Sequence, residues 1–211
     1  KVIVAESSLT HSGAIKPLHF SDYLSRVSPS MAYKIEVLRV DLSAFSDSWS
    51  REISSREALI HHILANHPNA RFINSDLDEI PSLDSVKLFL ELPPNNYHFQ
   101  TQTYYRFANW ALLDSHSNWN RGVFGRFAKL PTIFGIEKGA HFSYLGRNSN
   151  NMANKLESFA HTELNKTALK SREFIEFADQ NVVDHLGRSR NRGFGILKIL
   201  AEDQLSSLHK Q

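Results

Sequence analysis

The first half of the chain alternates between segments of strand character and segments of helix character, and no other sequence feature limits the fold as strongly. The apolar run VIVA at 2–5, the alternating pattern YKIEVLRVDL at 33–42 and the apolar run at 70–75 are typical of strands. Apolar residues at helical spacing predict a helix over 50–66, and Pro81 predicts the opening of a second helix over 82–92. Strands that alternate with helices favour an α/β fold with a central, mostly parallel mixed sheet flanked by helices.

The second half is rich in aromatic residues and glycine. Residues 97–107 (YHFQTQTYYRF) alternate cleanly and predict a strand, the Trp-containing segment 109–126 is typical of a loop, and GAHFSYLG at 139–146 predicts a short strand and a turn. Helices are expected at about 150–161 and 168–180, and a final amphipathic helix at 195–208.

Composition excludes several classes of protein. A chain of 211 residues suits one compact domain, and a net charge of +2 is too small to indicate a nucleic-acid partner. The basic run RSRNR at 188–192 is interpreted as a solvated loop. The chain has no cysteine, so it has no disulfide, thiolate zinc site or cysteine nucleophile. We expect no membrane segment in this chain, and its start in a strand pattern is compatible with an excerpt of a longer polypeptide with further domains.

Three carboxylates follow the apolar run at 70–75, in the order Asp76, Asp78 and Glu79. On an extended strand Asp76 and Asp78 point to the same face while Leu77 points into the core. Two carboxylates that converge at a strand end suit a hard cation such as Mn²⁺ or Mg²⁺, which neutralises charge that develops on a departing diphosphate. The alternative is a solvated turn.

The D-x-D pattern also fits two kinds of enzyme. In a haloacid-dehalogenase-type phosphatase the first Asp is a nucleophile, but that motif normally lies on the first strand. In a nucleotide-sugar transferase the motif follows at least two strands, as it does here. A non-catalytic carbohydrate-binding module that uses Trp110 and Trp119 is a further alternative.

Several segments together resemble glycosyltransferase family 17. The resemblance rests on the segments VIVAESSLTHSGAIKPLHF, SREALIHHIL, ARFINSDLDEIPSLDSVKLFL, YHFQTQTYYRFANW, GAHFSYLG and NKLESFAHTELN, in this order over most of residues 1–165. The chain departs from the animal members of the family at Ala140, where they tend to have Trp, in lacking their cysteines, and after about residue 180. The chain also resembles the glycosyltransferase domain of a large virus-encoded protein, which implies action in the cytoplasm of a host cell.

The resemblance implies a single GT-A domain over 1–211. A nucleotide-binding half would span about 1–92, an acceptor and metal-completing half about 93–190, and a C-terminal helix or linker 191–211. It also implies a UDP-sugar donor such as UDP-glucose, a divalent metal (Mn²⁺ or Mg²⁺) and a hydroxyl acceptor on a glycan or glycoprotein.

The metal ligands implied by the resemblance are Asp76, Asp78 and His141, with Asp78 the direct ligand. A neutral imidazole at His141 suits Mn²⁺ better than Mg²⁺; the alternative for His141 is a strand histidine in the core. The implied nucleotide-sugar contacts are Ala5, Glu6, Ser7, Arg56, Asp76 and Lys155. The alternatives are an ion pair with Glu52 at i−4 for Arg56 and a solvated helix position for Lys155.

The catalytic candidates are Asp78, Glu79, His161 and Glu163, with Asp114 as an outsider. A transfer that inverts the sugar configuration needs a carboxylate or histidine base on the acceptor hydroxyl. For the HTE segment at 161–163 a structural hydrogen bond is an equal alternative. Trp110, Trp119 and Tyr104 could stack on sugar rings, although core or rim packing is the simpler interpretation of each.

Overall fold

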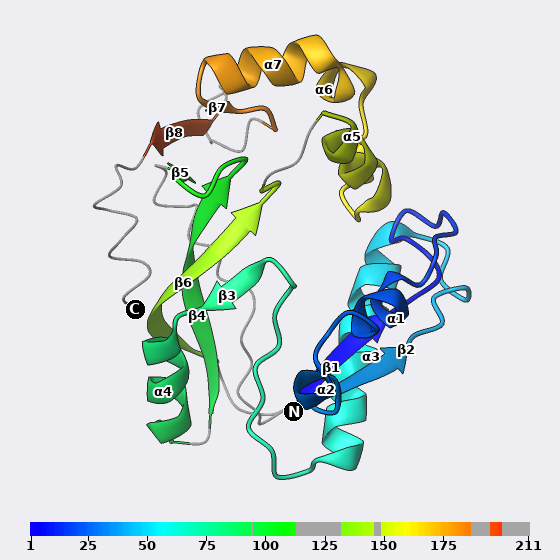
Figure 1. The fold of residues 1–211 in the computed structure, drawn as a ribbon, viewed down its shortest axis with the longest axis vertical. Coiled ribbons are helices and arrows are strands. Elements are labelled where there is room, and N and C mark those ends of the chain that lie inside the picture. Colours follow the sequence, from blue (N-terminus) through cyan, green and yellow to red (C-terminus); the bar gives the residue numbers. More distant parts are fainter. Residues whose placement is uncertain (94, 113–131, 146–148, 187–194, 200–211) are drawn as a thin grey trace. The chain divides into compact units, whose positions relative to one another are not determined.

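The computed structural model describes residues 1–93, 95–112, 132–145, 149–186 and 195–199. These residues form two compact units, one from Lys1–Ala70 with Ala153–Thr167 and the other from Arg71–Met152 with Ala168–Gln211. Figure 1 labels the helices and strands of both units. The single domain expected from the sequence stays a prediction.

The first unit is built on two parallel strands and one long helix. Strand β1 (Val2–Glu6) pairs with β2 (Ile35–Arg39) in parallel, with Val2 opposite Ile35 and Glu6 opposite Arg39. Helix α3 (Ser48–Asn66) follows, and the side chain of Asp47 caps it by accepting a hydrogen bond of 2.9 Å from the Ser50 N–H. The strands expected at 2–5 and 33–42 and the helix expected over 50–66 are therefore confirmed. Short helices α1 (His19–Leu24) and α2 (Pro29–Ala32) lie between β1 and β2 in the chain.

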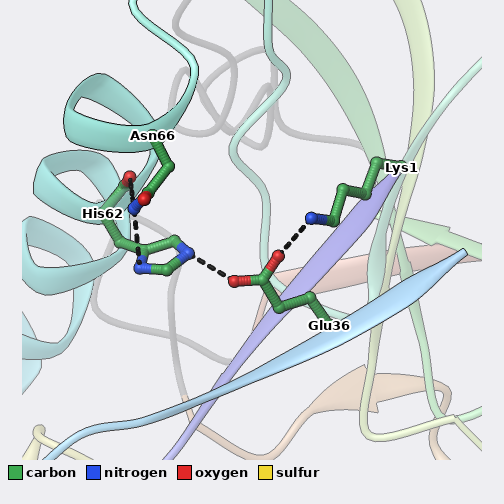
Figure 2. Close-up of polar contacts among 4 residues, drawn as sticks. All are labelled: Lys1, Glu36, His62 and Asn66. Carbon is green, nitrogen blue, oxygen red and sulfur yellow. Dashed lines mark hydrogen bonds and ion pairs between the residues drawn. The ribbon is translucent and has the colours of Figure 1, made fainter.

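A polar link joins β2 to α3. The carboxylate of Glu36 lies 2.5 Å from His62 Nε2 of α3 and 2.5 Å from Lys1 Nζ (Figure 2). Asn66, one turn later on α3, donates a hydrogen bond of 2.8 Å to the His62 carbonyl. The pKa of Glu36 is lowered, first by its hydrogen bond from Lys1 and then by that from His62.

The second unit contains a six-stranded mixed sheet in the order β3-β6-β4-β5-β8-β7 (Figure 1). The strands are β3 (Glu79–Pro81), β4 (Asn96–Tyr105), β5 (Trp110–Leu112), β6 (Thr132–Ser143), β7 (Val183–Asp184) and β8 (Gly195–Ile199). Within this sheet β4 and β6 are parallel, whereas β3 runs antiparallel to β6 at the edge. The expected α/β class with mixed sheets and flanking helices is confirmed. The expectation of a mostly parallel sheet is wrong for this sheet, because four of the five neighbouring strand pairs among the described residues are antiparallel.

Helix α4 (Leu83–Glu91) packs on the sheet through an aromatic core. Phe89 of α4 contacts Tyr97 and Phe99 of β4, with ring centroids 6.1 and 5.9 Å apart, and all three side chains are buried. Ser82 caps the helix by accepting a hydrogen bond from the Ser85 N–H, and Pro81 ends β3 rather than opening the helix.

The strand predicted over 70–75 is wrong, because this segment has no ladder partner and no regular structure. It is held by side chains instead. The Arg71 guanidinium donates hydrogen bonds of 3.0, 2.7 and 2.8 Å to the carbonyls of Phe89, Leu90 and Leu92 at the end of α4. Ile73 packs against the Phe89 aromatic core.

The C-terminal elements agree with the sequence only in part. The expected helices appear as α5 (Ser149–Ser158), α6 (Thr167–Lys170) and α7 (Arg172–Gln180), and a short 3₁₀ turn, η2 (Thr162–Leu164), lies between α5 and α6. The final helix predicted over 195–208 is wrong at its start, where residues 195–199 form β8 and pair with β5 and β7. Residues 113–131, which include Asp114 and Trp119, and the basic run at 188–192 lie outside the described residues. In the described part of the chain, none of the helices combines the length and the apolarity that crossing a membrane requires.

Candidate functional site

The carboxylates of the D-x-D segment lie on a tight turn at the start of β3. The Glu79 N–H donates to the Asp76 carbonyl over 3.0 Å, which places Leu77 and Asp78 at the two corners of the turn. The expectation that Leu77 points into the core is wrong, since its side chain is 85% exposed. Asp76 and Asp78 therefore do not share the face of a strand, because no strand is formed at these residues.

Asp78 is fixed against β6 and lies beside His141. Its carbonyl accepts a hydrogen bond of 2.8 Å from the Phe142 N–H, and its Oδ1 lies 3.9 Å from His141 Nε2. The side chain of Asp78 is one-third exposed, whereas that of His141 is largely buried. The structure thus brings two of the three predicted metal ligands together on adjoining elements (β3 and β6 in Figure 1).

Glu79 and His141 are direct neighbours across the sheet. They occupy the same register position of the antiparallel β3/β6 pair, and Thr103 of β4 lies opposite His141 on its other side. All three side chains are buried, as are Thr101 and Ser143 near them in sequence. A buried row of polar groups therefore crosses β3, β6 and β4 beside Asp78.

Gly139, which is opposite Pro81 and two residues before His141, allows β3 and β4 to approach β6 closely beside this row. A Cβ at this position would lie 2.9 Å from Thr101 Cγ2 and 3.0 Å from the Ile80 carbonyl oxygen. Any larger residue would have to push these strands apart, so the glycine of the GAHFSYLG motif has a packing reason.

A second cluster, near the ends of β4 and β6, was not found from the sequence. The Arg106 guanidinium donates to both carboxylate oxygens of Asp179, its Nε lying 2.8 Å from Oδ1, and the Arg106 side chain is buried. The buried rings of Tyr105, Tyr144 and His185 meet with centroids 5.4–5.6 Å apart. Arg106, Tyr144 and Val182 adopt left-handed backbone conformations, with φ of 65°, 60° and 55°. Such conformations cost about 1–3 kcal/mol each, so packing must hold them in place.

In the first unit, Glu6 at the end of β1 is engaged by several donors. Its Oε1 accepts a hydrogen bond of 2.9 Å from the Phe20 N–H at the start of α1, and its Oε2 accepts one from Arg39. Burial raises the pKa of Glu6, but the hydrogen bonds from the Phe20 and His19 N–H groups and from Arg39 outweigh it, so the pKa is lowered overall. Glu6 joins the end of β1 to α1 and β2.

The other predicted nucleotide contacts of this unit are near β1 or on helices. Ala5 is half-buried, and the buried Ser7 hydroxyl accepts a hydrogen bond of 3.2 Å from the Leu9 N–H. Arg56 lies 3.3 Å from Glu52 Oε1, so the i−4 ion pair considered as its alternative is present. Lys155 is half-buried in the last turn of α5.

His161 and Glu163 form a pair at the start of η2. The His161 Nδ1 lies 2.6 Å from Glu163 Oε1, and both side chains are exposed, at 40% and 60%. The His161 ring also meets Trp49 of α3 edge-on, with centroids 4.6 Å apart. The hydrogen bond with His161 is the main cause of a lowered pKa at Glu163. Sequence reasoning named this pair but not the contact of His161 with Trp49.

Two aromatic candidates for sugar stacking are described. Tyr104 is buried and stacks on Phe142, with ring centroids 5.4 Å apart, and burial raises the pKa of its hydroxyl. Trp110 is half-buried and packs on Phe107 with centroids 4.7 Å apart. Core packing therefore accounts for Tyr104.

Among the residues that the structure describes, no three His, Asp or Glu side chains converge closely enough to hold a metal ion by themselves. Asp78 and His141 are a pair of donors, one oxygen and one nitrogen, whose separation of 3.9 Å lets one ion contact both. They fit a divalent cation whose remaining positions are filled by water or phosphate oxygens, as is usual where a cation is bound with a nucleotide.

One family model matches this chain. The model of glycosyltransferase family 17 matches residues 1–182, which includes the turn, His141 and the His161–Glu163 pair. The chain belongs to glycosyltransferase family 17 and is a glycosyltransferase enzyme, which uses a sugar donor and an acceptor. Comparisons with curated proteins and with solved structures gave no match.

Proposed function

We propose that this glycosyltransferase moves a hexosyl unit from a UDP-sugar to a hydroxyl group of a glycan or glycoprotein. The observation that carries the proposal is the approach of Asp78 Oδ1 to His141 Nε2, at 3.9 Å, on a turn anchored to β6. In this proposal Asp78 and His141 bind a divalent cation, Mn²⁺ in preference to Mg²⁺ because one ligand is an imidazole. When bound, the cation neutralises charge on the diphosphate of the departing UDP.

The remaining residues have supporting roles in this proposal. Asp76, the first residue of the turn that carries Asp78, contacts the ribose or a water molecule. The phosphate contacts expected for Arg56 and Lys155, which belong to the other compact unit, stay predictions. Glu6 is engaged with α1 and Arg39, so we assign it to holding the end of β1, and the nucleotide contacts expected for Ala5 and Ser7 on either side of it stay predictions. Action in the cytoplasm of a host cell stays a prediction.

His161 is our candidate for the base that accepts the proton of the acceptor hydroxyl. Glu163 holds Nδ1 of the exposed ring at 2.6 Å, which leaves Nε2 as the nitrogen that can accept a proton. This is the arrangement by which a carboxylate orients an imidazole in other enzymes.

Calorimetry with UDP, with and without Mn²⁺, tests the metal assignment. We expect the wild type to bind UDP at least tenfold more tightly with Mn²⁺ and the Asp78→Asn variant to lose this difference. Asp84→Asn is the matched control, because Asp84 is an exposed carboxylate of α4 paired only loosely with Lys87, at 3.6 Å. UDP binding that ignores Mn²⁺, or that Asp78→Asn leaves unchanged, would contradict the proposal.

A further inference from the structure

Glu79 is the one carboxylate of the DLDE segment that is fully buried, with 5% of its surface exposed. Sequence reasoning placed it among the catalytic candidates. A group that exchanges protons with an acceptor hydroxyl must be within hydrogen-bonding distance of that hydroxyl. Because Glu79 is buried, its side chain contacts other groups of the protein.

The carboxylate of Glu79 closes the turn that carries Asp78. Its Oε2 accepts a hydrogen bond of 3.1 Å from the Asp76 N–H, while its own N–H donates to the Asp76 carbonyl over 3.0 Å. Asp76 and Glu79 are therefore joined by two reciprocal hydrogen bonds, one through the backbone and one through the Glu79 side chain.

The same residue is in register with His141 across the β3/β6 pair. Asp78 is held from one side by the reciprocal Asp76–Glu79 hydrogen bonds and from the other by the Phe142 N–H, which donates to its carbonyl over 2.8 Å. These contacts set where the Asp78 carboxylate lies relative to His141 Nε2.

We infer that Glu79 is a positioning residue, whose side chain fixes the 76–79 turn and thereby the spacing between Asp78 and His141. The inference rests on the proposed function, in which these two residues bind the cation. Residues that orient metal ligands typically change metal affinity or activity by about 10–100-fold when they are replaced.

Two substitutions at Glu79 separate its geometry from its charge. Glu79→Gln loses the charge but keeps an oxygen at the same reach, which can still accept from the Asp76 N–H. Glu79→Asp keeps the charge but is shorter by one methylene group and cannot reach. If Glu79 is a positioning residue, the Glu79→Gln variant keeps its function and the Glu79→Asp variant loses it. If Glu79 is instead an acid or base that exchanges protons with the substrate, the Glu79→Gln variant is inactive.

Three measurements on the full chain decide the matter. They are hydrogen exchange of the Asp76 amide by NMR without metal, the dissociation constant of Mn²⁺ by electron paramagnetic resonance, and kcat and KM for sugar transfer. We expect Glu79→Gln to stay within about threefold of wild type in all three, and Glu79→Asp to speed Asp76 exchange and weaken Mn²⁺ binding by about tenfold or more. Melting temperatures show whether a variant has lost its fold; Glu57→Gln, at an exposed position of α3, is the control.

The inference is overturned if Glu79→Gln lowers kcat as far as loss of a catalytic group would, while Asp76 exchange and Mn²⁺ affinity stay at wild-type values. It is also overturned if Glu79→Asp leaves Asp76 exchange unchanged. Failure of the wild type to bind Mn²⁺ would overturn the proposed function instead. In that case slow Asp76 exchange that Glu79→Asp abolishes would still support the role of Glu79 in closing the turn.

Discussion

Replacement of Gly139 by alanine tests the close packing of the strands beside Asp78 and His141. The added Cβ would lie 2.9 Å from Thr101 Cγ2, 3.0 Å from the Ile80 carbonyl oxygen and 3.2 Å from Pro81 Cα. Carbon atoms in proteins normally approach to about 3.5–4.0 Å, so these neighbours must retreat by roughly 0.5 Å. Two of the three atoms belong to the backbone of β3, and Thr101 is buried, so no flexible surface group can absorb the change.

The size of the effect follows from two opposing contributions. Forcing an extra methyl group into a packed site costs about 1–3 kcal/mol, whereas replacing glycine by alanine gains about 0.4–1 kcal/mol by restricting the unfolded chain. We therefore expect Gly139→Ala to lower the free energy of unfolding by about 1–2 kcal/mol. For a chain of this length this corresponds to a fall in Tm of about 2–8 °C.

A double-mutant cycle identifies the cause. Thr101→Ser deletes Cγ2, the nearest atom, and by itself removes one buried methyl group at a cost of about 0.8 kcal/mol. Denaturant unfolding of the two single variants and the double variant should show a favourable coupling of about 0.5–1 kcal/mol, because the serine makes room for the new methyl group. A Gly139→Ala variant as stable as wild type, or strict additivity with Thr101→Ser, would refute the close approach described here.

Two further predictions concern charged side chains. Arg106→Met should lower the free energy of unfolding by about 2–3 kcal/mol, because it leaves the carboxylate of Asp179 without its bidentate partner in a largely buried site. Arg172→Met, which breaks an exposed i,i+4 pair with Glu176, should change it far less in the same denaturant assay, because exposed ion pairs contribute little. Equal losses would contradict the difference in burial. The ionised carboxylate of Glu6 is held by the Phe20 and His19 N–H groups and by Arg39, with Lys16 nearby, and its pKa in the folded protein is therefore lowered. The ionised form stabilises the fold at pH values above the unfolded pKa of about 4.5, and this contribution disappears as the pH falls through the folded pKa. Thermal melts from pH 6 to pH 3 should therefore show a shallower loss of stability for Glu6→Gln than for wild type, and parallel curves would show that the contacts of Glu6 do not favour its ionised form.

Local sequence patterns predicted most of the elements. Apolar residues at helical spacing predicted the helix over 50–66, and Pro81 predicted a helix over 82–92; both helices are present as α3 and α4, although Ser82 and not Pro81 starts the second. The alternation over 97–107 predicted β4 because side chains on a strand alternate between faces, and Tyr97, Phe99 and Thr101 are indeed buried on one face.

The same patterns failed where an apolar run has no single structural meaning. In the apolar run at 70–75, Ile73 packs on Phe89, as a core residue of a strand would. The segment is nevertheless held by the hydrogen bonds of Arg71 to the end of α4 and not by a neighbouring strand. Residues 195–199 carry an apolar pattern that suits a helix, and their pairing with β5 and β7 makes them a strand. In both segments the backbone conformation is set by contacts with residues that are distant in the sequence.

The sequence by itself determined the family, the order of most elements and the presence of Asp78, Glu79, His141 and the His161–Glu163 pair as chemically capable groups. Only the tertiary structure decided which of these groups meet. The pairing of β3 with β6 brings Asp78 to His141 and encloses Glu79, and the turn at 76–79 exposes Leu77 instead of burying it. The reason is that a motif specifies the residues and their local backbone preferences, whereas distances between side chains depend on strand register and on packing against elements from elsewhere in the chain.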